Sequence, residues 1–160
     1  MTKTEEGRKY EKIALDCLKQ NNLSEAESNF LQALKYMQES GDEEGQAYVM
    51  GNLGNLFFQS RRLDKAEEYY GMALTYMEKV NDIRGIESSL GNLGSVLFYK
   101  GNLDQAEEIY KKGLKLLEKG NDIEGQSIYN ENLGNVYLKK DDLKVAEDYF
   151  SRAKTLLDSE

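Results

Sequence analysis

Side chains that commonly carry out chemistry are scarce in this sequence. Histidine is absent from all 160 residues, and cysteine occurs once, as Cys17. Because histidine is the commonest general base and the commonest metal ligand, its absence weakens most enzyme and metal-site hypotheses. Cys17 has no histidine to activate it and no second cysteine to pair with. We therefore expect a small buried core residue and not a nucleophile.

Acidic residues gather in short clusters, at Asp42-Glu43-Glu44 and at Asp141-Asp142. Such carboxylates could bind a hard cation or form an acid–base pair. Both clusters fall where helices are expected to start, however, and carboxylates there interact favourably with the helix dipole. The sequence has no calcium-loop spacing and no phosphate-binding glycine loop. It predicts no catalytic residue, no metal site and no cofactor.

Polar side chains, all but one of them asparagine, recur every 40 residues and form a ladder, here called the amide ladder, that calls for a functional account. They form two columns three positions apart, the first Asn52, Asn92 and Asn132 and the second Asn55, Ser95 and Asn135. Asparagine is a mediocre helix former, and residues three apart share a helix face. Phe58 and Phe98 follow another turn along. The amides offer paired donors and acceptors for a ligand; alternatively, they bond to neighbouring helices, and the rings belong to the core.

The elements that position these columns are four copies of a 40-residue unit. A leucine, an alanine and a glutamate recur without any gap at Leu23-Ala26-Glu27, Leu63-Ala66-Glu67, Leu103-Ala106-Glu107 and Leu143-Ala146-Glu147. Aromatic residues occupy the column 30, 70, 110 and 150, and small residues the column 14, 54, 94 and 134. Apolar residues within a unit fall three or four apart, which indicates two amphipathic helices per unit.

The pattern predicts first helices at about 7–20, 43–60, 83–100 and 123–140, and second helices at about 24–39, 64–79, 104–119 and 144–158. Ser24, Asp64 and Asp104 precede a glutamate by three residues, which favours a capping box at the start of the second helix. Lys144 breaks this pattern, and Asp141 or Asp142 is expected to cap there instead.

The turns between units have their own signature. Gly41, Asn81 and Asn121 suit the left-handed backbone that ends a helix, and each is followed by an aspartate, Asp42, Asp82 or Asp122, that can cap the next helix. We therefore expect short and regular turns.

This arrangement resembles the tetratricopeptide repeat (TPR) family over nearly the whole chain. Gly54, Phe57, Ala66, Tyr70 and Ala73 occupy the family's small and aromatic positions in the second repeat. The family repeat usually has 34 residues and a proline, whereas this one has 40 and none. That length, and the phrase at residues 51–55 (Gly-Asn-Leu-Gly-Asn), are similar to the Pins-type subclass. The first repeat is the most diverged, since Ala14 replaces the glycine and Cys17 the residue equivalent to Phe57.

The resemblance implies a fold and a use for the amide ladder. The fold is an all-α solenoid, a right-handed superhelix of four helix–turn–helix repeats, whose concave groove is lined mainly by the first helices. Amides in that groove bond to the backbone of an extended bound peptide, and Phe58 and Phe98 would supply apolar pockets. Family members that grip acidic carboxy-terminal tails carry a basic clamp, whose places here hold Leu15, Asn55 and Glu131 among others. We do not expect that kind of ligand.

Charge and hydropathy limit the partners. The net charge of −8 and a pI near 4.8 disfavour nucleic acid, whose binding depends on lysine and arginine. No stretch is apolar enough to span a membrane, and no signal peptide begins the chain, so we expect a cytoplasmic protein without membrane contact. An acidic chain also meets basic partners more readily, although such a charge commonly serves only to keep a protein dispersed.

The prediction is one TPR domain over residues 1–160, with repeats at approximately 7–46, 47–86, 87–126 and 127–160. It is expected to be a non-catalytic scaffold that binds a peptide or protein segment, a monomer in preference to a homo-oligomer. The alternatives are a self-assembling structural module and a small-molecule sensor or enzyme, the last two of which would need a buried polar pocket.

Two columns also predict exposed ends. Asp16 stands where later repeats have Leu56, Val96 and Val136, and Lys154 stands where earlier repeats have leucine. We expect both charged side chains to be exposed in the outermost repeats.

Overall fold

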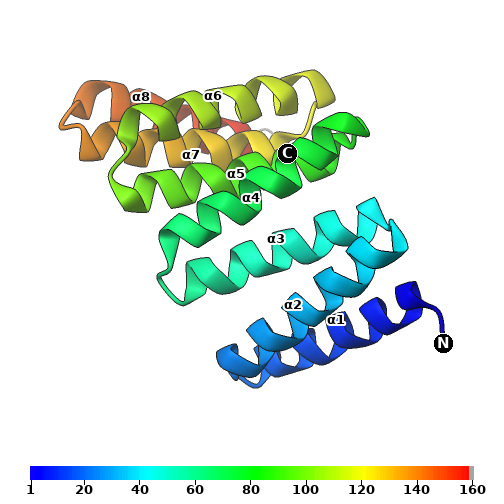
Figure 1. Ribbon diagram of the computed structural model, residues 1–160. Helices are drawn as coiled ribbons and strands as arrows, with labels where there is room; N and C mark the ends of the chain where they lie inside the picture. The colour runs from blue at the N-terminus through cyan, green and yellow to red at the C-terminus, as the bar shows by residue number, and fades with distance from the viewer. Residues whose placement is uncertain (159–160) are drawn as a thin grey trace. The chain divides into compact units, whose positions relative to one another are not determined.

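The computed structural model describes residues 1–158, and within that range it contains α-helices and no strand (Figure 1). The helices are α1 (Lys3–Lys19), α2 (Leu23–Ser40), α3 (Glu43–Gln59), α4 (Leu63–Lys79), α5 (Ile83–Lys100), α6 (Leu103–Gly120), α7 (Ile123–Lys139) and α8 (Leu143–Leu157). Consecutive pairs pack as hairpins, one per repeat. The expected all-α class and the expected helices are confirmed, with bounds that differ by a few residues. Residues 159–160 of the expected last repeat lie outside the described range.

The turn inside each hairpin differs from the predicted capping box. One residue of each turn has left-handed backbone, at Asn21, Arg61, Gly101 and Asp141. The next residue is the N-cap, so the second helix begins at the leucine of the repeat. The prediction that Ser24, Asp64 and Asp104 cap these helices is therefore wrong, because all three already lie in the first turn. The expected cap by Asp142 is confirmed, since its Oδ1 accepts from the Val145 amide at 3.2 Å.

Between hairpins the predicted left-handed residues and the predicted caps by Asp42 and Asp122 are confirmed, and the cap by Asp82 stays a prediction. Gly41, Asn81 and Asn121 have left-handed backbone, with φ of 71°, 54° and 56°. Asp42 caps α3 by accepting from the Gly45 amide at 2.8 Å, and Asp122 caps α7 in the same way. These caps satisfy amides that would otherwise be free at a helix start.

Helix α1 begins earlier than predicted. Thr2 is its N-cap, and its hydroxyl accepts from the Glu5 amide at 3.2 Å while the Glu5 carboxylate accepts from the Thr2 amide at 2.7 Å. This reciprocal pair is a capping box. It adds about one turn to a helix whose first residues carry no apolar periodicity.

The chain divides into two compact units, Met1–Asp82 and Ile83–Glu160, each made of two hairpins. Phe30, Leu53 and Phe57 are fully buried in the first unit. The core of the second is a cluster of Leu97, Ala106, Tyr110, Leu114, Leu117, Tyr129, Leu133 and Val136. The single domain of residues 1–160 and its four repeat boundaries stay predictions.

The small-residue column lets the two helices of a hairpin approach closely. A methyl group added at Gly54 would lie 2.6 Å from the ring of Tyr70, and one added at Gly134 would lie 2.6 Å from the ring of Phe150. No carbon atoms approach so closely in a relaxed structure. The aromatic column therefore packs directly on the backbone of the first helix.

The predicted exposure of the two charged side chains in the outermost repeats is confirmed. Asp16 and Lys154 are both exposed, whereas Leu56, Val96 and Val136 are fully buried. Asp16 lies beside Lys19, with 3.2 Å between Nζ and Oδ1.

Candidate functional site

The predicted amide ladder lies on the first helices and is partly exposed. Asn55 on α3 and Asn135 on α7 are exposed. Asn52, Asn92, Ser95 and Asn132 are partly buried. In each unit the ladder forms the outward side of a helix whose other side packs in the core.

The second column also bonds to the aromatic column of the same hairpin. The Tyr70 hydroxyl donates to Oδ1 of Asn55 at 2.5 Å, and the Tyr110 hydroxyl lies 3.1 Å from the Ser95 hydroxyl. Burial raises the pKa of Tyr70 to about 12, so the phenol stays protonated. The fourth repeat has Phe150 in this column, which has no hydroxyl to donate. Asn55 thus has a structural bond that Asn135 does not share.

Asn52, from the first column, contacts the neighbouring repeat in the first unit. Nδ2 of Asn52, on α3, lies 3.5 Å from Oε1 of Glu11, on α1. Burial raises the pKa of Glu11, with Asp42 acting in the same direction and Arg8 against it. The contact is long for a hydrogen bond and adds little to stability.

The two phenylalanines are partly buried. Phe98 packs on the core cluster of the second unit, edge-on to Tyr99, and the Lys139 ammonium lies 4.8 Å from its ring centroid. Phe58 is partly buried in the first unit. Phe98 therefore fits the alternative, a residue of the core edge, better than an open apolar pocket.

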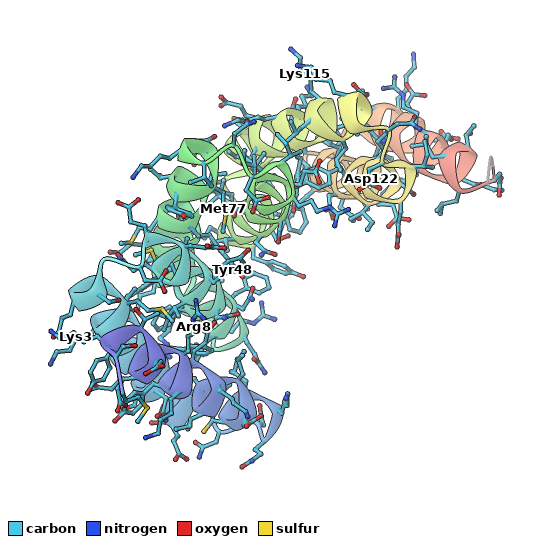
Figure 2. All side chains as sticks on the ribbon, turned by 90° about the vertical axis from the view of Figure 1, so that its right-hand side faces the viewer. Lys3, Arg8, Tyr48, Met77, Lys115 and Asp122 are labelled. Carbon is cyan, nitrogen blue, oxygen red and sulfur yellow. The ribbon has the colours of Figure 1, made fainter. Side chains whose placement is uncertain are left out.

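Two exposed apolar residues extend the ladder and were missed from the sequence. Tyr48 and Ile128 are 52% and 50% exposed, and each precedes a ladder asparagine by four residues. Their column in the repeat alignment holds Arg8, Tyr48, Ser88 and Ile128. An apolar residue on an otherwise polar helix face could have identified Tyr48 and Ile128 from the sequence. Figure 2 labels Arg8 and Tyr48, which together line a small cavity of about 180 Å³ in the first unit.

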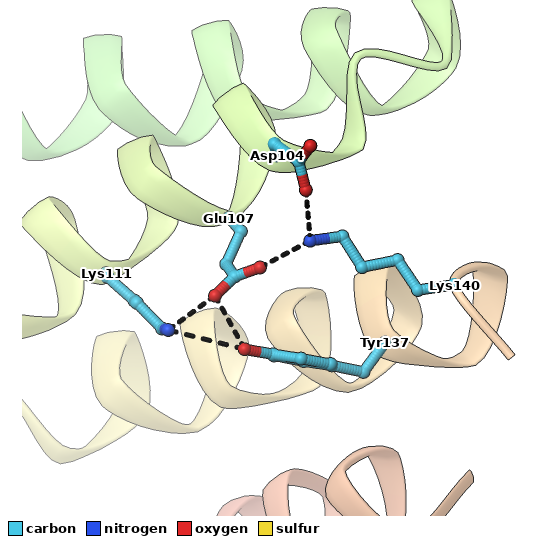
Figure 3. Close-up of polar contacts among 5 residues, drawn as sticks. All are labelled: Asp104, Glu107, Lys111, Tyr137 and Lys140. Carbon is cyan, nitrogen blue, oxygen red and sulfur yellow. Dashed lines mark hydrogen bonds and ion pairs between the residues drawn. The ribbon is translucent and has the colours of Figure 1, made fainter. Parts of the chain in front are cut away.

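The glutamates expected to complete capping boxes instead tie neighbouring repeats together. In the second unit, Lys140 Nζ lies 2.6 Å from both Asp104 Oδ1 and Glu107 Oε2, and Glu107 also accepts from Tyr137 and Lys111 (Figure 3). Burial opposes ionisation of Glu107, yet the bonds from Lys111, Lys140 and Tyr137 lower its pKa to about 2.

The first unit has an equivalent tie. Arg62 donates two hydrogen bonds to the Glu27 carboxylate, at 3.0 and 2.7 Å, and its guanidinium carbon lies 4.5 Å from the centroid of the Phe57 ring. Such a bidentate geometry is specific to arginine. These contacts link neighbouring repeats within each unit.

Neither the cysteine nor the acidic side chains form a reactive or metal-binding arrangement. Cys17 is buried, as expected, and burial together with the carboxylates of Glu25 and Asp16 raises the pKa of its thiol. Throughout residues 1–158, no three acidic or cysteine side chains are placed to hold a metal ion, and no helix is long and apolar enough to cross a membrane.

Comparison with known families settles the classification. The tetratricopeptide repeat profile matches residues 5–79 and 85–159, which together cover nearly all of the chain. The chain belongs to the tetratricopeptide repeat family. This TPR protein is thus an all-α helical repeat solenoid with four hairpins in the described residues.

Solved structures give the same fold. BtubC (BKLC) from P. vanneervenii has a TM-score of 0.86 and 27% sequence identity, covering 94% of this chain and 62% of that one. The apo form of RapI has a TM-score of 0.91 and 16% identity, covering 96% and 57%. A Rap protein complexed with Competence and Sporulation Factor has a TM-score of 0.79 and 18% identity, covering 99% and 45%. The TPR chain thus spans roughly half to three fifths of these proteins. A comparison with curated proteins gives no match.

Proposed function

We propose that this TPR protein is a non-catalytic scaffold that holds a segment of a partner protein on the exposed side of its first helices. The observation that carries the proposal is a repeated stripe, Tyr48-Asn52-Asn55 on α3 and Ile128-Asn132-Asn135 on α7. Positions i, i+4 and i+7 share one face of a helix. Each stripe combines an exposed apolar anchor with two amides.

This combination suits an extended protein segment. The apolar anchor can bury a side chain of the partner, and a carboxamide can accept from and donate to a backbone peptide group at the same time. Ser95 and Asn92, on α5, add further hydroxyl and amide groups in the second unit. Phe58 and Phe98 are partly buried, three positions after Asn55 and Ser95, and the part of each ring that is exposed would add apolar area beside the stripe.

The family supports the same function, since TPR proteins generally act as interaction scaffolds and not as catalysts. One structure of the same fold is a Rap protein complexed with Competence and Sporulation Factor. Binding of a segment in a concave groove, the Pins-type character of the repeats and a cytoplasmic location are parts of this proposal that rest on the sequence. So do the expectations of a monomer and of no nucleic-acid partner.

Photo-crosslinking tests the proposed surface. A photoreactive phenylalanine analogue placed at Tyr48 or at Ile128 should crosslink to partner proteins in the native cell. The same analogue at Leu31, which is 41% exposed on a second helix, is the matched control. Crosslinks at Leu31 but not at either stripe would place the binding surface elsewhere.

Once a partner has been found in this way, amide variants measure how much Asn55 and Asn135 contribute to its binding affinity. Asn135→Ala and Asn55→Ala, the latter in a Tyr70→Phe background, should each remove a contact of about 1 kcal/mol. Together they should weaken binding about thirtyfold in a calorimetric titration. If affinity is unchanged while the variants stay folded, the amides do not bind the partner.

Self-association is a second candidate because one apolar patch in the second unit is uncovered. Leu138 and Leu143, which line one hollow together with Ala146 and Phe150, are 50% and 60% exposed. If this patch pairs with a second copy of the chain, sedimentation equilibrium should give a mass that rises with concentration. Leu143→Glu should abolish that rise, and a constant monomer mass would exclude this candidate.

A further inference from the structure

Helix α7 packs on α6 in the second unit, and this contact shows how one repeat covers the next (Figure 3). Leu133 and Val136 of α7 lie in the same buried cluster as Tyr110 and Leu114 of α6. Helix α3 packs on α2 in the first unit, and Leu53, the equivalent of Leu133, is fully buried there. Each contact therefore joins the second helix of one repeat to the first helix of the following repeat.

Helix α8 exposes the surface that a following repeat would cover. Leu143 is 60% exposed, whereas Leu103, at the equivalent place on α6, packs on the buried cluster. Phe150 is partly exposed where Tyr110 is buried. Leu143 and Phe150 line a hollow of about 370 Å³ together with Lys154. The hollow has the position on α8 that α7 covers on α6, so it suits the first helix of a repeat.

Helix α1 exposes the matching surface, which a preceding repeat would cover. Ile13 is 37% exposed, whereas Leu53 and Leu133 in the same column are fully buried. Asp16 is exposed in the column of the buried Val136. Helices α8 and α1 therefore present the two halves of a contact that α6 and α7 already form.

The charges on the two surfaces are complementary when α1 of a second copy is placed on α8 in the register of α7 on α6. Lys154 and Asp16 then take the places of Leu114 and Val136, which belong to one cluster. Opposite charges attract there, and the long lysine stem can keep its ammonium near water, which limits the cost of desolvation.

Glu131 gives a second complementary contact in the same register. Nδ2 of Asn52 lies 3.5 Å from Oε1 of Glu11, which belongs to the preceding repeat. The equivalent places across two copies hold Glu131 of the first copy and Lys12 of the second. Both side chains are exposed in the single chain. A long amide contact would thus become an ion pair between copies.

A neighbouring pair of columns also places a lysine beside Glu131. A methyl group added at Gly91 would lie 3.0 Å from the Tyr129 hydroxyl, so these two positions adjoin across α5 and α7. Their equivalents across two copies are Glu131 and Lys9. The carboxylate of the first copy would therefore lie between two ammonium groups of the second, which favours this register electrostatically.

We propose that α8 of one copy of this chain binds α1 of a second copy, in the register in which α7 packs on α6. This inference rests on the second candidate function above, self-association, and replaces the monomer expected from the sequence. The two surfaces of this head-to-tail contact differ, so each bound copy still presents one of them to a further copy. Such a contact builds rings or open filaments and not a symmetric dimer.

Two variants block the two surfaces separately. Ile13→Glu alters the α1 surface and Leu143→Glu the α8 surface, and both positions are exposed, so both chains should fold, as circular dichroism checks. In sedimentation equilibrium the wild-type mass should rise past that of a dimer with concentration, whereas each variant should stay a monomer. An equimolar mixture of the variants should form a dimer and nothing larger, because α8 of the Ile13→Glu chain can still bind α1 of the Leu143→Glu chain.

The other outcomes separate this contact from self-association in general. A mixture that stays monomeric would overturn the head-to-tail contact. So would association that Leu143→Glu abolishes and Ile13→Glu leaves unchanged, because two α8 surfaces would then pair with each other and self-association would stand. A wild-type chain of constant monomer mass would remove both ideas, while crosslinking at Tyr48 and Ile128 would still decide the scaffold function.

A charge exchange tests the register. Lys12→Glu and Glu131→Lys should each weaken association about tenfold, because each replaces an attraction by a repulsion. A chain with both changes should associate more tightly than either single variant, since opposite charges again face each other. Lys115→Glu makes the same charge change on α6 and should leave the affinity nearly unchanged. A double variant weaker than both single variants would overturn the proposed register, and with it the proposal.

Discussion

The Tyr70 hydroxyl donates to Oδ1 of Asn55 at 2.5 Å, so the exposed amide of one helix holds the buried phenol of the next. Tyr70 is 3% exposed. Removing the amide would leave a buried donor unpaired. Asn55 therefore contributes to folding in addition to its proposed role in binding.

Asn55→Ala should lower the free energy of unfolding by about 1–2 kcal/mol, whereas Asn135→Ala should be nearly neutral, because Phe150 carries no hydroxyl. Urea unfolding followed by circular dichroism measures both. In a Tyr70→Phe background, Asn55→Ala should cost no more than a few tenths of a kcal/mol. An equal loss in both backgrounds would mean that the hydrogen bond does not account for the effect.

Gly54→Ala should destabilise the protein by about 1–3 kcal/mol, although alanine is the better helix former. The added methyl group would lie 2.6 Å from the Tyr70 ring, so the ring or the helix must move. Gly71→Ala on α4 is the control, since nothing lies within 4 Å of its added methyl group, and it should stabilise by about 0.5–1 kcal/mol. Thermal midpoints that shift in the same direction for both variants would contradict the packing argument.

Glu107→Gln should cost on the order of 1–2 kcal/mol at pH 7, because Lys140, Lys111 and Tyr137 lose a partly buried carboxylate. The folded state lowers the pKa of Glu107 to about 2, so its contribution is fully present above the ordinary glutamate pKa and is lost as the pH falls through about 2. The difference between wild type and variant should shrink between about pH 5 and pH 2. Glu147→Gln makes the same charge change at an exposed position, and its effect should be small throughout.

Tyr110→Ala should cost about 3–5 kcal/mol and Phe150→Ala clearly less. Tyr110 is 3% exposed and contacts Tyr129 edge-on, with ring centroids 5.8 Å apart, whereas Phe150 is partly exposed. Equilibrium unfolding of the two variants gives the comparison. An equal loss would mean that the fourth hairpin is packed as tightly as the third.

The sequence by itself predicted the helices and the left-handed turn residues. The 40-residue period set the helices, since apolar spacing and helix length involve only neighbouring residues. Gly41, Asn81 and Asn121 could be assigned to left-handed turns because their own φ preferences decide the matter. Burial of Cys17 and exposure of Asp16 and Lys154 also followed, because comparison of equivalent columns reveals which positions face a neighbouring repeat.

The partner of each polar group was decided by the tertiary structure. Tyr70 reaches Asn55, and Lys140 reaches Glu107 thirty-three residues earlier, because packing of the helices brings these side chains together. The same packing buries one Asn130 oxygen without a donor from residues 1–158, while Asn135, five residues later, is exposed. Sequence spacing gives the face of a helix on which a side chain lies, but a hydrogen bond depends on interatomic distances of a few tenths of an ångström. Those distances are set by how the helices pack against one another.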